Sequence, residues 1–437
     1  MISPIHRNLL ALAIPSIIAN ITTPLMGLVD TVVTGHLGSE VFIASVAVAG
    51  SLFNLLYWPM GFLRMGTSGL TAQAVGRADI REQADSLYRG LACALAVAIV
   101  IIVLQRPLLT VLLEFIGSNE QTDRFVREYF YIVAWGAPAV LSTYTMTGWL
   151  LGMQSAKKQM ALSIIINVVN ITISPLLAFH FNMGIRGVAC GTLIAQWAGA
   201  ICGMVMCMKM VHGAISRQTF STKSLLRYFH VNSDIFLRTL CLIAVTIWFT
   251  REGARQGELM LSVNALLMQF FILFSYMTDG FAYAAEAEVG RLTGAGSRDK
   301  LRQCIRILMK WGFVLALLFS ATYFIGGRTF LDLLTDRENV VAAAKDYLPW
   351  ACTVPLAGFM AFTWDGIFIG ATMTRQMLVS MLVATGVFFG IFFMMGSRLG
   401  NHGLWLAFMT YLLTRGLIQW AMWRRMSVKS SRRSTQI

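Results

Sequence analysis

Long apolar segments dominate this sequence, and short polar connections separate them. Each segment holds about twenty residues or more, the length that a helix needs to cross the roughly 30 Å hydrocarbon core of a bilayer. Apolar and polar residues do not alternate within the segments, as they would in the strands of a membrane barrel. Hydrophobic residues make up 57% of the chain and charged residues 13%, which is more apolar material than a soluble fold can bury. The sequence therefore predicts an all-α membrane protein.

The segments predict twelve transmembrane helices. The first is a retained helix, because its apolar stretch is too long and unbroken for a cleaved signal peptide. We expect the first six helices near residues 9–36, 42–74, 87–112, 124–151, 157–180 and 185–209. The second six are expected near residues 232–254, 259–290, 301–327, 340–370, 374–397 and 402–424. The polar stretch at 211–230 is the longest connection, so we expect an N-terminal lobe at residues 1–212 and a C-terminal lobe at 213–437.

The net charge of +14 is compatible with nucleic-acid binding, so the placement of the basic residues has to decide. These residues gather on alternate connections, such as Arg77 and Arg81 after the second segment and Lys157 and Lys158 after the fourth, and in the C-terminal tail. This is the positive-inside asymmetry of membrane proteins. It predicts that both termini are cytoplasmic and that the basic surplus has no nucleic-acid partner.

The two halves of the chain resemble each other, which indicates an internal repeat. Three groups of residues recur in the same order at nearly the same interval. Gly61, Phe62 and Gly76 correspond to Gly280, Phe281 and Gly296, and Pro138, Gly148 and Gly152 correspond to Pro355, Gly366 and Gly370. Gly184 and Gly187 correspond to Gly400 and Gly403. Because each copy has an even number of spans, the copies have the same orientation. Such parallel repeats favour a transporter in which one half rocks against the other around a central cavity.

Five ionisable residues inside the predicted spans stand out, because a charge there is costly and therefore indicates function or a structural partner. They are Asp30, Arg64, Asp279, Glu286 and Asp365. Asp279 and Glu286 are seven residues apart and share one helix face. Arg64 lies at a comparable depth, so we expect a salt bridge across the halves that acts as a structural pair or a gate rather than as a substrate contact. Asp365 has no basic partner within its helix, and it either serves a second site or reaches water at the membrane edge.

Asp30 has no basic residue within two turns along its own helix. Burial disfavours the ionised form of a carboxylate, so Asp30 can bind and release a proton as a cavity alternates between dry and wet. The alternative is a carboxylate held for helix packing. Pro15 interrupts the same helix, and this break either links the charge on Asp30 to the cavity or is an ordinary membrane-helix proline. The second half has neutral residues, Thr250 or its neighbours, at the corresponding place, so we expect the coupling chemistry in the N-terminal lobe.

The sequence contains no nucleotide-binding or hydrolase motif, since it lacks a Walker loop, an HExxH and a GxSxG. Its seven cysteines are scattered without a CxxC pair, which argues against a zinc site. We therefore expect no enzymatic activity, no cofactor and no bound metal. A passive channel would not need a buried titratable acid on a helix that proline interrupts.

Four segments resemble the multidrug and toxic compound extrusion (MATE) family, in its DinF-like branch. They are residues 27–38 (GLVDTVVTGHLG), 69–74 (GLTAQA), 279–287 (DGFAYAAEA) and 365–371 (DGIFIGA). The resemblance extends over essentially the whole chain. It implies a V-shaped protein of two six-helix lobes in a bacterial cytoplasmic (inner) membrane. Such a protein exports small organic compounds, often cationic or amphiphilic, in exchange for protons or sodium, and we expect it to act as a monomer.

The resemblance also implies roles for individual residues. Asp30 matches the family's acidic residue in the first helix, and Pro15 matches the proline at which that helix bends. Asn170 matches the asparagine that assists the acid, and Thr192 matches a threonine on the sixth helix. Ser174 departs from the pattern, because many members have an aspartate there. Sodium prefers more anionic oxygen, so we expect proton coupling, with sodium coupling as the alternative.

A lipid-linked saccharide flippase of the same superfamily is a further alternative. Those proteins gather several intramembrane cations to hold pyrophosphate, whereas this sequence suggests that Arg64 stands nearly alone and that acids predominate. The sequence therefore favours a secondary active exporter with the bilayer and small organic substrates as its partners.

Overall fold

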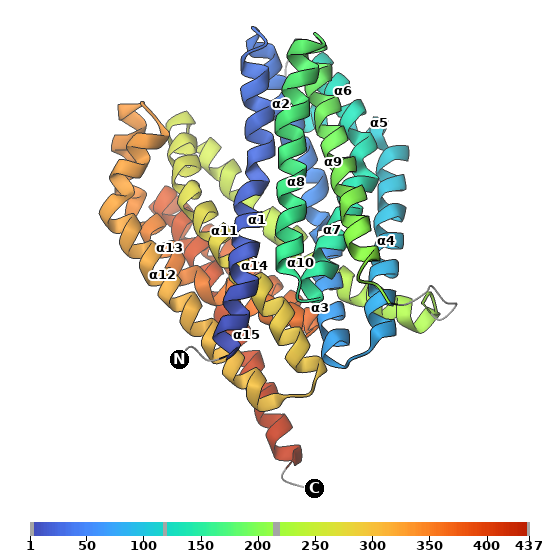
Figure 1. Ribbon diagram of the computed structural model, residues 1–437. Coiled ribbons are helices and arrows are strands. Elements are labelled where there is room, and N and C mark those ends of the chain that lie inside the picture. Colours follow the sequence, from blue (N-terminus) through green and yellow to red (C-terminus); the bar gives the residue numbers. More distant parts are fainter. Residues whose placement is uncertain (1–3, 117–119, 213–218, 435–437) are drawn as a thin grey trace. The chain divides into compact units, whose positions relative to one another are not determined.

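The computed structural model describes residues 4–116, 120–212 and 219–434, and every regular element in these ranges is helical (Figure 1). The first half contains α1 (Pro4–Gly35), α2 (Glu40–Tyr57), α3 (Phe62–Gly76), α4 (Ile80–Val103), α5 (Gln105–Ile116), α6 (Glu120–Val133), α7 (Ala137–Gly152), α8 (Ala156–Pro175) and α9 (Gly184–Met208). The second half contains α10 (Thr222–Arg255), α11 (Glu258–Gly294), α12 (Arg298–Leu334), α13 (Glu338–Gly370), α14 (Thr374–Leu399) and α15 (Asn401–Ser434). Three short helical turns complete the described chain: η1 (Trp58–Gly61), η2 (Ala134–Gly136) and η3 (Leu176–His180).

Ten helical segments in the described ranges are long and apolar enough to cross a membrane. They coincide with ten of the twelve predicted spans. The predicted fourth span corresponds to α6, η2 and α7, and the twelfth corresponds to α15. The other two segments are shorter or less apolar. In the fourth, α6 is rich in charged residues and α7 is short, and in the twelfth, α15 carries Arg415 and Gln419 within its apolar stretch.

The chain divides into two compact units by its internal contacts. The N-unit comprises Ile14–Asn232 with Gly294–Gly296, and the C-unit comprises Met1–Ala13, Ser233–Thr293 and Ser297–Ile437. The first turns of α10 belong to the N-unit, where the Tyr228 hydroxyl lies 3.3 Å from Thr67 Oγ1. The predicted boundary between lobes, after residue 212, adjoins residues 213–218, which lie outside the described residues, and it stays a prediction.

Backbone conformation reveals the internal repeat most directly. Non-glycine residues rarely adopt a positive φ angle, and glycine adopts it freely at the ends of helices. Three pairs of positive-φ residues are separated by the same number of residues along the chain: Ala78 (55°) and Gly296 (66°), Gln154 (59°) and Thr372 (52°), and Asn182 (51°) and Gly400 (54°). A fourth pair, Gly38 and Gly257, differs from that interval by one residue. The turns between helices therefore repeat, and the sequence pairings of Gly76 with Gly296 and of Gly184 with Gly400 are each wrong by two residues.

Close helix approaches repeat at the same interval. A side chain at Gly148 would collide with the backbone of Arg64 on α3, and one at Gly366 would collide with the backbone of Ala282 on α11. One turn further along, Gly152 and Gly370 meet the backbone in the same way. Small residues allow membrane helices to approach this closely. The predicted pairing of Gly148 and Gly152 with Gly366 and Gly370 is confirmed.

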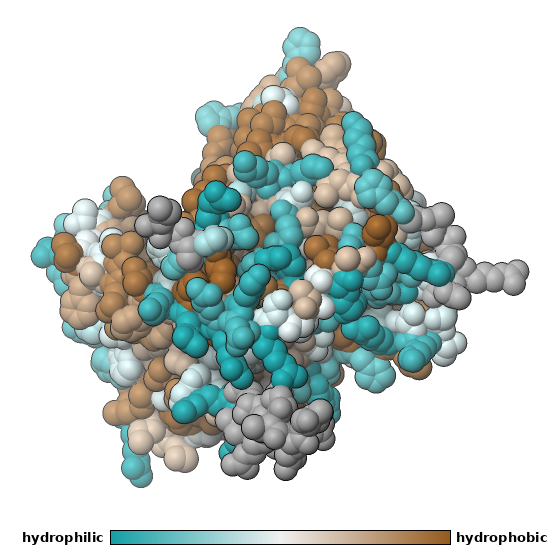
Figure 2. All heavy atoms as spheres, turned by 60° about the horizontal axis from the view of Figure 1, so that its bottom comes forward, coloured by the Kyte–Doolittle hydropathy of each residue, from teal (hydrophilic) through white to brown (hydrophobic). Residues whose placement is uncertain are grey.

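Large apolar side chains are exposed on the sides of the helices. Among the most exposed are Val103, Phe324, Ile325 and Phe393, with relative exposures of 71%, 67%, 89% and 65%. Figure 2 shows hydrophobic residues over much of the visible helix sides, whereas hydrophilic residues gather at the end that faces the viewer. Exposed apolar surface on this scale marks contact with lipid or with a partner, and on helices of this length it indicates lipid.

Candidate functional site

The strongest polar site lies around Asp30, on the apolar helix α1. Asp30 is 3% exposed and belongs to the N-unit. The helix continues from Pro4 to Gly35 through two internal prolines, Pro15 and Pro24. A proline cannot donate a backbone hydrogen bond, so α1 has two weakened points on the N-terminal side of its buried carboxylate. The predicted bend at Pro15 stays a prediction.

Three side chains from three other helices donate hydrogen bonds to the Asp30 carboxylate. The Tyr129 hydroxyl on α6 lies 3.0 Å from Oδ2, and the Thr192 hydroxyl on α9 lies 2.8 Å from the same oxygen. Asn170 Nδ2 on α8 lies 3.2 Å from Oδ1. All three donors are buried, so the hydrogen bonds are shielded from water. None of these three partners carries a positive charge, and the carboxylate is therefore held by dipoles alone within this set.

Asn170 connects the carboxylate to two further hydroxyls. Its Nδ2 lies 3.1 Å from Ser174 Oγ and 3.1 Å from Thr192 Oγ1. An amide nitrogen carries two hydrogens, so it cannot donate fully to these two hydroxyls and to Asp30 at the same time. Asn170 Oδ1 is buried without a hydrogen-bond partner. This network of Asp30, Tyr129, Asn170, Ser174 and Thr192, here called the Asp30 cluster, can therefore adopt more than one hydrogen-bond pattern.

Local sequence explains why α8 and α9 place these groups together. Gly191 precedes Thr192, and a side chain at this glycine would collide with Ser174. The missing side chain lets α9 approach α8 closely enough for the Asn170 amide to reach Thr192. Pro175 follows Ser174 and ends α8, after which the chain continues as η3.

The structure brings Asp30, Asn170, Ser174 and Thr192 together, as the family resemblance implied, although their role in coupling stays a prediction. Sequence reasoning missed Tyr129. It lies in the most strongly amphipathic and charge-rich part of the first half, where many polar side chains face outward, and the spacing along α6 does not reveal which one meets α1.

A second buried cluster lies in the C-unit around Asp365 on α13. Arg238 on α10 and Arg415 on α15 both donate to Asp365 Oδ2. Gln419 Nε2, one turn after Arg415, lies 2.8 Å from Oδ1. These four residues, here called the Asp365 cluster, are all buried, and Asp365 itself is 6% exposed. The alternative that Asp365 reaches water at the membrane edge is therefore wrong.

The Asp365 cluster contains two buried cations that the sequence interpretation did not single out. The sequence interpretation placed Arg64 nearly alone, but Arg238 and Arg415 are buried in α10 and α15 as well. Both lie inside predicted spans, 232–254 and 402–424, so their charges were visible in the sequence, although the interpretation did not single them out. Local spacing does not show that the two share one carboxylate on a third helix. With two guanidinium groups and one carboxylate, the cluster has a formal charge of +1.

The remaining predicted residues are distributed over both units. Arg64 lies on α3 of the N-unit and is half-buried, and Asp279, also half-buried, lies on α11 of the C-unit. Glu286, on the same helix as Asp279, is 1% exposed. The predicted salt bridge between Arg64 and these acids would join the two units, and it stays a prediction.

The repeat shows that the two clusters occupy different places in the two halves. At the repeat interval, Asp30 corresponds to Trp248 or Phe249, Asn170 to Phe388 and Ser174 to Phe392. Trp248 packs edge-on against Phe392, with 5.9 Å between ring centroids. The C-unit therefore has aromatic packing where the N-unit has its polar cluster, which agrees with the expectation of a neutral counterpart close to Thr250.

Comparison with known protein families also finds two matching segments in this chain. The MatE family model matches residues 15–176 and 234–394. This chain belongs to the MATE family. The two matches fall one in each half, as the repeat requires. MATE proteins are membrane transporters for multidrug and toxin extrusion and have twelve transmembrane helices, so the predicted fold class and the transporter assignment are confirmed.

Relatives of this MATE protein include bacterial and mammalian proteins. It is 37% identical over 418 residues to "DNA damage-inducible protein F" of Escherichia coli K12, covering 95% of this chain and 91% of that protein. It is 23% identical to mouse "Multidrug and toxin extrusion protein 2", covering 91% and 70% of the two chains. A solved MATE structure in the bent conformation superposes with a TM-score of 0.90 at 18% identity, covering 100% and 98%. A Vibrio cholerae MATE transporter in its bent form gives 0.86 at 16% identity, covering 96% of each chain.

Proposed function

We propose that this MATE protein exports small organic cations or amphiphiles in exchange for protons, and that Asp30 is the carboxylate that binds the coupling proton. The observation that carries this proposal is the Asp30 cluster, in which hydroxyl and amide groups hold a buried carboxylate. A salt-bridged carboxylate keeps its charge because a cation compensates it. A carboxylate held by neutral donors can exist in both protonation states, because losing its charge leaves no uncompensated cation in the cluster.

The hydrogen-bonding groups around Asp30 are compatible with both its ionised form and its protonated form. When it is ionised, Asp30 accepts from Tyr129, Thr192 and Asn170. When it is protonated, Asp30 has a hydroxyl donor that needs an acceptor. Rotation of the amide of Asn170, whose Oδ1 is buried without a partner, would supply one. Protonation would thus rearrange contacts between α1 and α8, and the two prolines of α1 give this helix the freedom to repack.

Transport would then follow from alternating access. With Asp30 ionised, the cavity holds the substrate. Proton entry from outside neutralises Asp30, α1 repacks, and the substrate leaves toward the outside. Release of the proton toward the cytoplasm resets the cycle. The proposal also places both termini in the cytoplasm, which the alternate basic connections support. It further takes the protein to lie in a bacterial inner membrane and to act as a monomer.

Sodium coupling is the competing proposal, and the composition of the cluster argues against it. The cluster offers one anionic side chain, because Ser174 stands where many family members have an aspartate. A hard cation that loses its water requires several oxygen ligands and gains from each added negative charge. One carboxylate with hydroxyl groups suits a proton better than it suits a sodium ion.

Reconstituted vesicles can test the proposal directly. Purified protein in liposomes would be given a proton gradient or a sodium gradient of equal size, and uptake of ethidium would be followed by fluorescence. We expect the proton gradient alone to drive uptake, and Asp30→Asn to abolish that uptake while the protein inserts normally. Asp234→Asn, which removes a carboxylate from a partly exposed pair with Arg375, is the matched control and should transport as the wild type does. Proton-driven transport by Asp30→Asn would overturn the proposal.

A further inference from the structure

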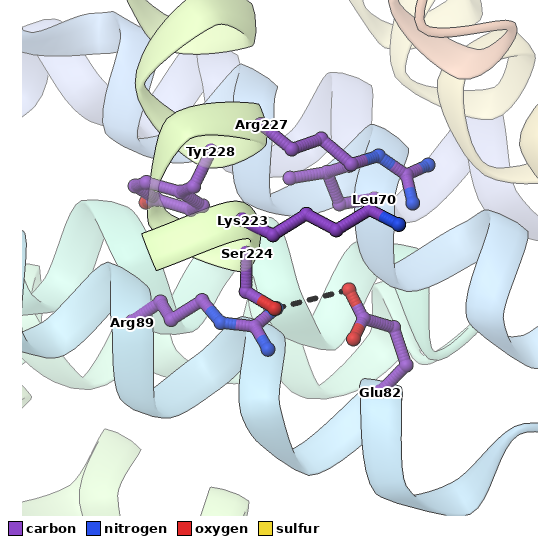
Figure 3. A pocket seen from close by; sticks show the side chains of 7 residues that line it. All are labelled: Leu70, Glu82, Arg89, Lys223, Ser224, Arg227 and Tyr228. Atoms are coloured by element: carbon purple, nitrogen blue, oxygen red, sulfur yellow. Dashed lines mark hydrogen bonds and ion pairs between the residues drawn. The ribbon is translucent and has the colours of Figure 1, made fainter. Parts of the chain in front are cut away.

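A small cavity lies at the start of α10, and none of its lining residues belongs to the Asp30 cluster or the Asp365 cluster. Its volume is about 130 Å³, the space of about four waters at roughly 30 Å³ each. It belongs to the N-unit, and its walls come from α3, α4 and α10 (Figure 3). The lining residues are Leu70, Glu82, Arg89, Lys223, Ser224, Arg227 and Tyr228.

Arg89 lines this cavity, and each of its three guanidinium nitrogens donates a hydrogen bond to a protein oxygen. Its Nη1 lies 3.0 Å from Glu82 Oε1, its Nη2 lies 3.1 Å from Asp85 Oδ2, and its Nε lies 2.6 Å from the carbonyl oxygen of Thr219. The Thr219 hydroxyl donates to the other oxygen of Asp85 at 2.7 Å. These contacts hold the chain that leads into α10 against α4. Glu82 and Asp85 together carry one more charge than Arg89, so these three side chains have a net formal charge of −1 and do not attract a further anion.

Lys223 and Arg227 make the cavity positive, because together with Glu82, Asp85 and Arg89 they give it a net formal charge of +1. They are one helical turn apart, and in Figure 3 both side chains extend from α10 in the same direction, so that their charged ends lie near each other beside Leu70. Both residues are exposed, and neither takes part in an ion pair among the described residues. The Ser224 hydroxyl lines the same space. The cavity therefore offers two cations and a hydroxyl group, a combination that suits a phosphate group. The Glu82 carboxylate also lines it, with Oε1 bound to Arg89.

Exposed apolar residues flank these two cations. Phe220, Leu226 and Phe229 have relative exposures of 41%, 54% and 55%, and they alternate with Lys223 and Arg227 along the entry to α10. A short segment that mixes basic and large apolar side chains lies well at the interface of a membrane, with its cations at the headgroups and its apolar groups among the acyl chains. The basic connections of the chain are expected on the same side of the membrane.

We propose that this cavity is a binding site for one anionic phospholipid, with the headgroup phosphate held by Lys223 and Arg227 and the acyl chains against Phe220, Leu226 and Phe229. A zwitterionic phospholipid carries its own cation, which competes with the two basic side chains, so it binds less well. The lipid would cover the point where the chain enters α10. It would therefore strengthen the packing of the first turns of α10 on α3 and α4, independently of the coupling chemistry at Asp30.

Native mass spectrometry of the full-length protein in detergent can test this site. The probes are palmitoyl-oleoyl phosphatidylglycerol and the phosphatidylcholine with the same acyl chains. We expect the wild type to retain one phosphatidylglycerol with at least a roughly tenfold preference over phosphatidylcholine, since each nearby basic residue contributes several-fold to binding of anionic lipid. The double variant Lys223→Gln/Arg227→Gln should lose this preference. Both residues are exposed, so the variant should fold, and an unchanged melting temperature without lipid checks this.

The matched control is Lys157→Gln/Lys158→Gln, which removes the same charge from the first turn of α8, away from the cavity lining. It should keep the phosphatidylglycerol preference within about threefold. An equal loss in both double variants would overturn the proposal, because it would show diffuse attraction to the basic surface. Displacement of phosphatidylglycerol by millimolar inorganic phosphate, or full retention in Leu226→Ser/Phe229→Ser, would also overturn it, because the site would then recognise a free phosphate rather than a lipid.

Discussion

Removal of the carboxylate of Asp365 is the most demanding test of the C-unit structure. In the variant Asp365→Asn, the two guanidinium groups of Arg238 and Arg415 lose the anion that they share. Arg238 is 6% exposed and Arg415 is 2% exposed, so water does not replace the lost charge. The two like charges would also face each other across the new amide.

The expected magnitude follows from this geometry. Breaking a buried ion pair by removing one partner costs about 3–5 kcal/mol, because an uncompensated charge stays buried. Here one substitution leaves two buried cations with neutral acceptors only, so we expect the upper part of that range. Native proteins have a free energy of unfolding of about 5–15 kcal/mol. The variant should therefore lose a large fraction of its stability, and its melting temperature should fall by at least about 5 °C.

The protein provides its own reporters for this measurement. Cys304 on α12 and Cys352 on α13 are free and buried in the C-unit, and Cys207 is free and buried in the N-unit. A thiol-reactive fluorophore labels such residues as the protein unfolds in detergent. We expect a clear decrease in the temperature of labelling for Asp365→Asn. Single-cysteine variants should show that Cys304 and Cys352 become reactive earlier than Cys207.

Two further variants test whether the loss of stability comes from the buried charges of the Asp365 cluster. Asp234→Asn removes a partly exposed carboxylate that lies 3.6 Å from the exposed Arg375, and it should cost less than about 1 kcal/mol. Asp365→Leu combined with Arg238→Met and Arg415→Met removes every charge of the cluster and should recover most of the stability. If Asp365→Asn melts within 1 °C of the wild type, the arginines are solvated and the description of the cluster is wrong.

Three other predictions concern the N-unit and the repeat. Thr192→Val should fold normally but lower proton-driven ethidium transport at least about tenfold, because Asp30 loses its 2.8 Å donor; Thr172→Val on the exposed side of α8 is the control, and equal activity of the two would count against the role of the cluster. Ser174→Asp adds a second carboxylate beside Asn170 and should make transport respond to a sodium gradient in the same vesicles; no sodium response would remove the argument drawn from Ser174. Gly366→Leu should prevent folding or lower the melting temperature strongly because of its collision with the backbone of Ala282, whereas Gly386→Leu, with no atoms within 4 Å, should be tolerated; similar yields of both variants would contradict the close approach of α11 and α13.

The helical segments were predictable from sequence because a bilayer imposes a minimum apolar length on each of them. The boundaries of α1, α8, α9 and α13 agree with the prediction within a few residues at most ends. The prediction differed by ten residues at the start of α10, which begins at Thr222, and at the end of α15, which ends at Ser434. The first turns of α10 carry basic residues that lower the hydropathy. They pack against the N-unit helices α3 and α4, where Tyr228 contacts Thr67 and Thr219, just before α10, contacts Asp85. Hydropathy measures the fit to lipid and is insensitive to such contacts.

The functional residues were predictable to the extent that a charge inside an apolar helix is conspicuous. Asp30 and Asp365 were found in that way. Their partners were harder to find, because a buried ionisable group is satisfied by side chains from other helices, as Tyr129 satisfies Asp30 and Arg415 satisfies Asp365. Asn170, Ser174 and Thr192 were identified through the family resemblance, since hydroxyls and amides are common in membrane helices and carry no signal individually.

The single carboxylate of the Asp30 cluster has a consequence for the energetics of export. One carboxylate takes up one proton, so one inward proton would be exchanged for one outward substrate molecule. For a neutral amphiphile, a membrane potential of 100 mV would contribute about 2.3 kcal/mol, close to a fiftyfold concentration ratio. For a monovalent organic cation, the exchange moves no net charge, so the potential contributes nothing and the ratio can reach only the proton concentration ratio. The charge of the substrate would thus decide which component of the proton-motive force the transporter uses.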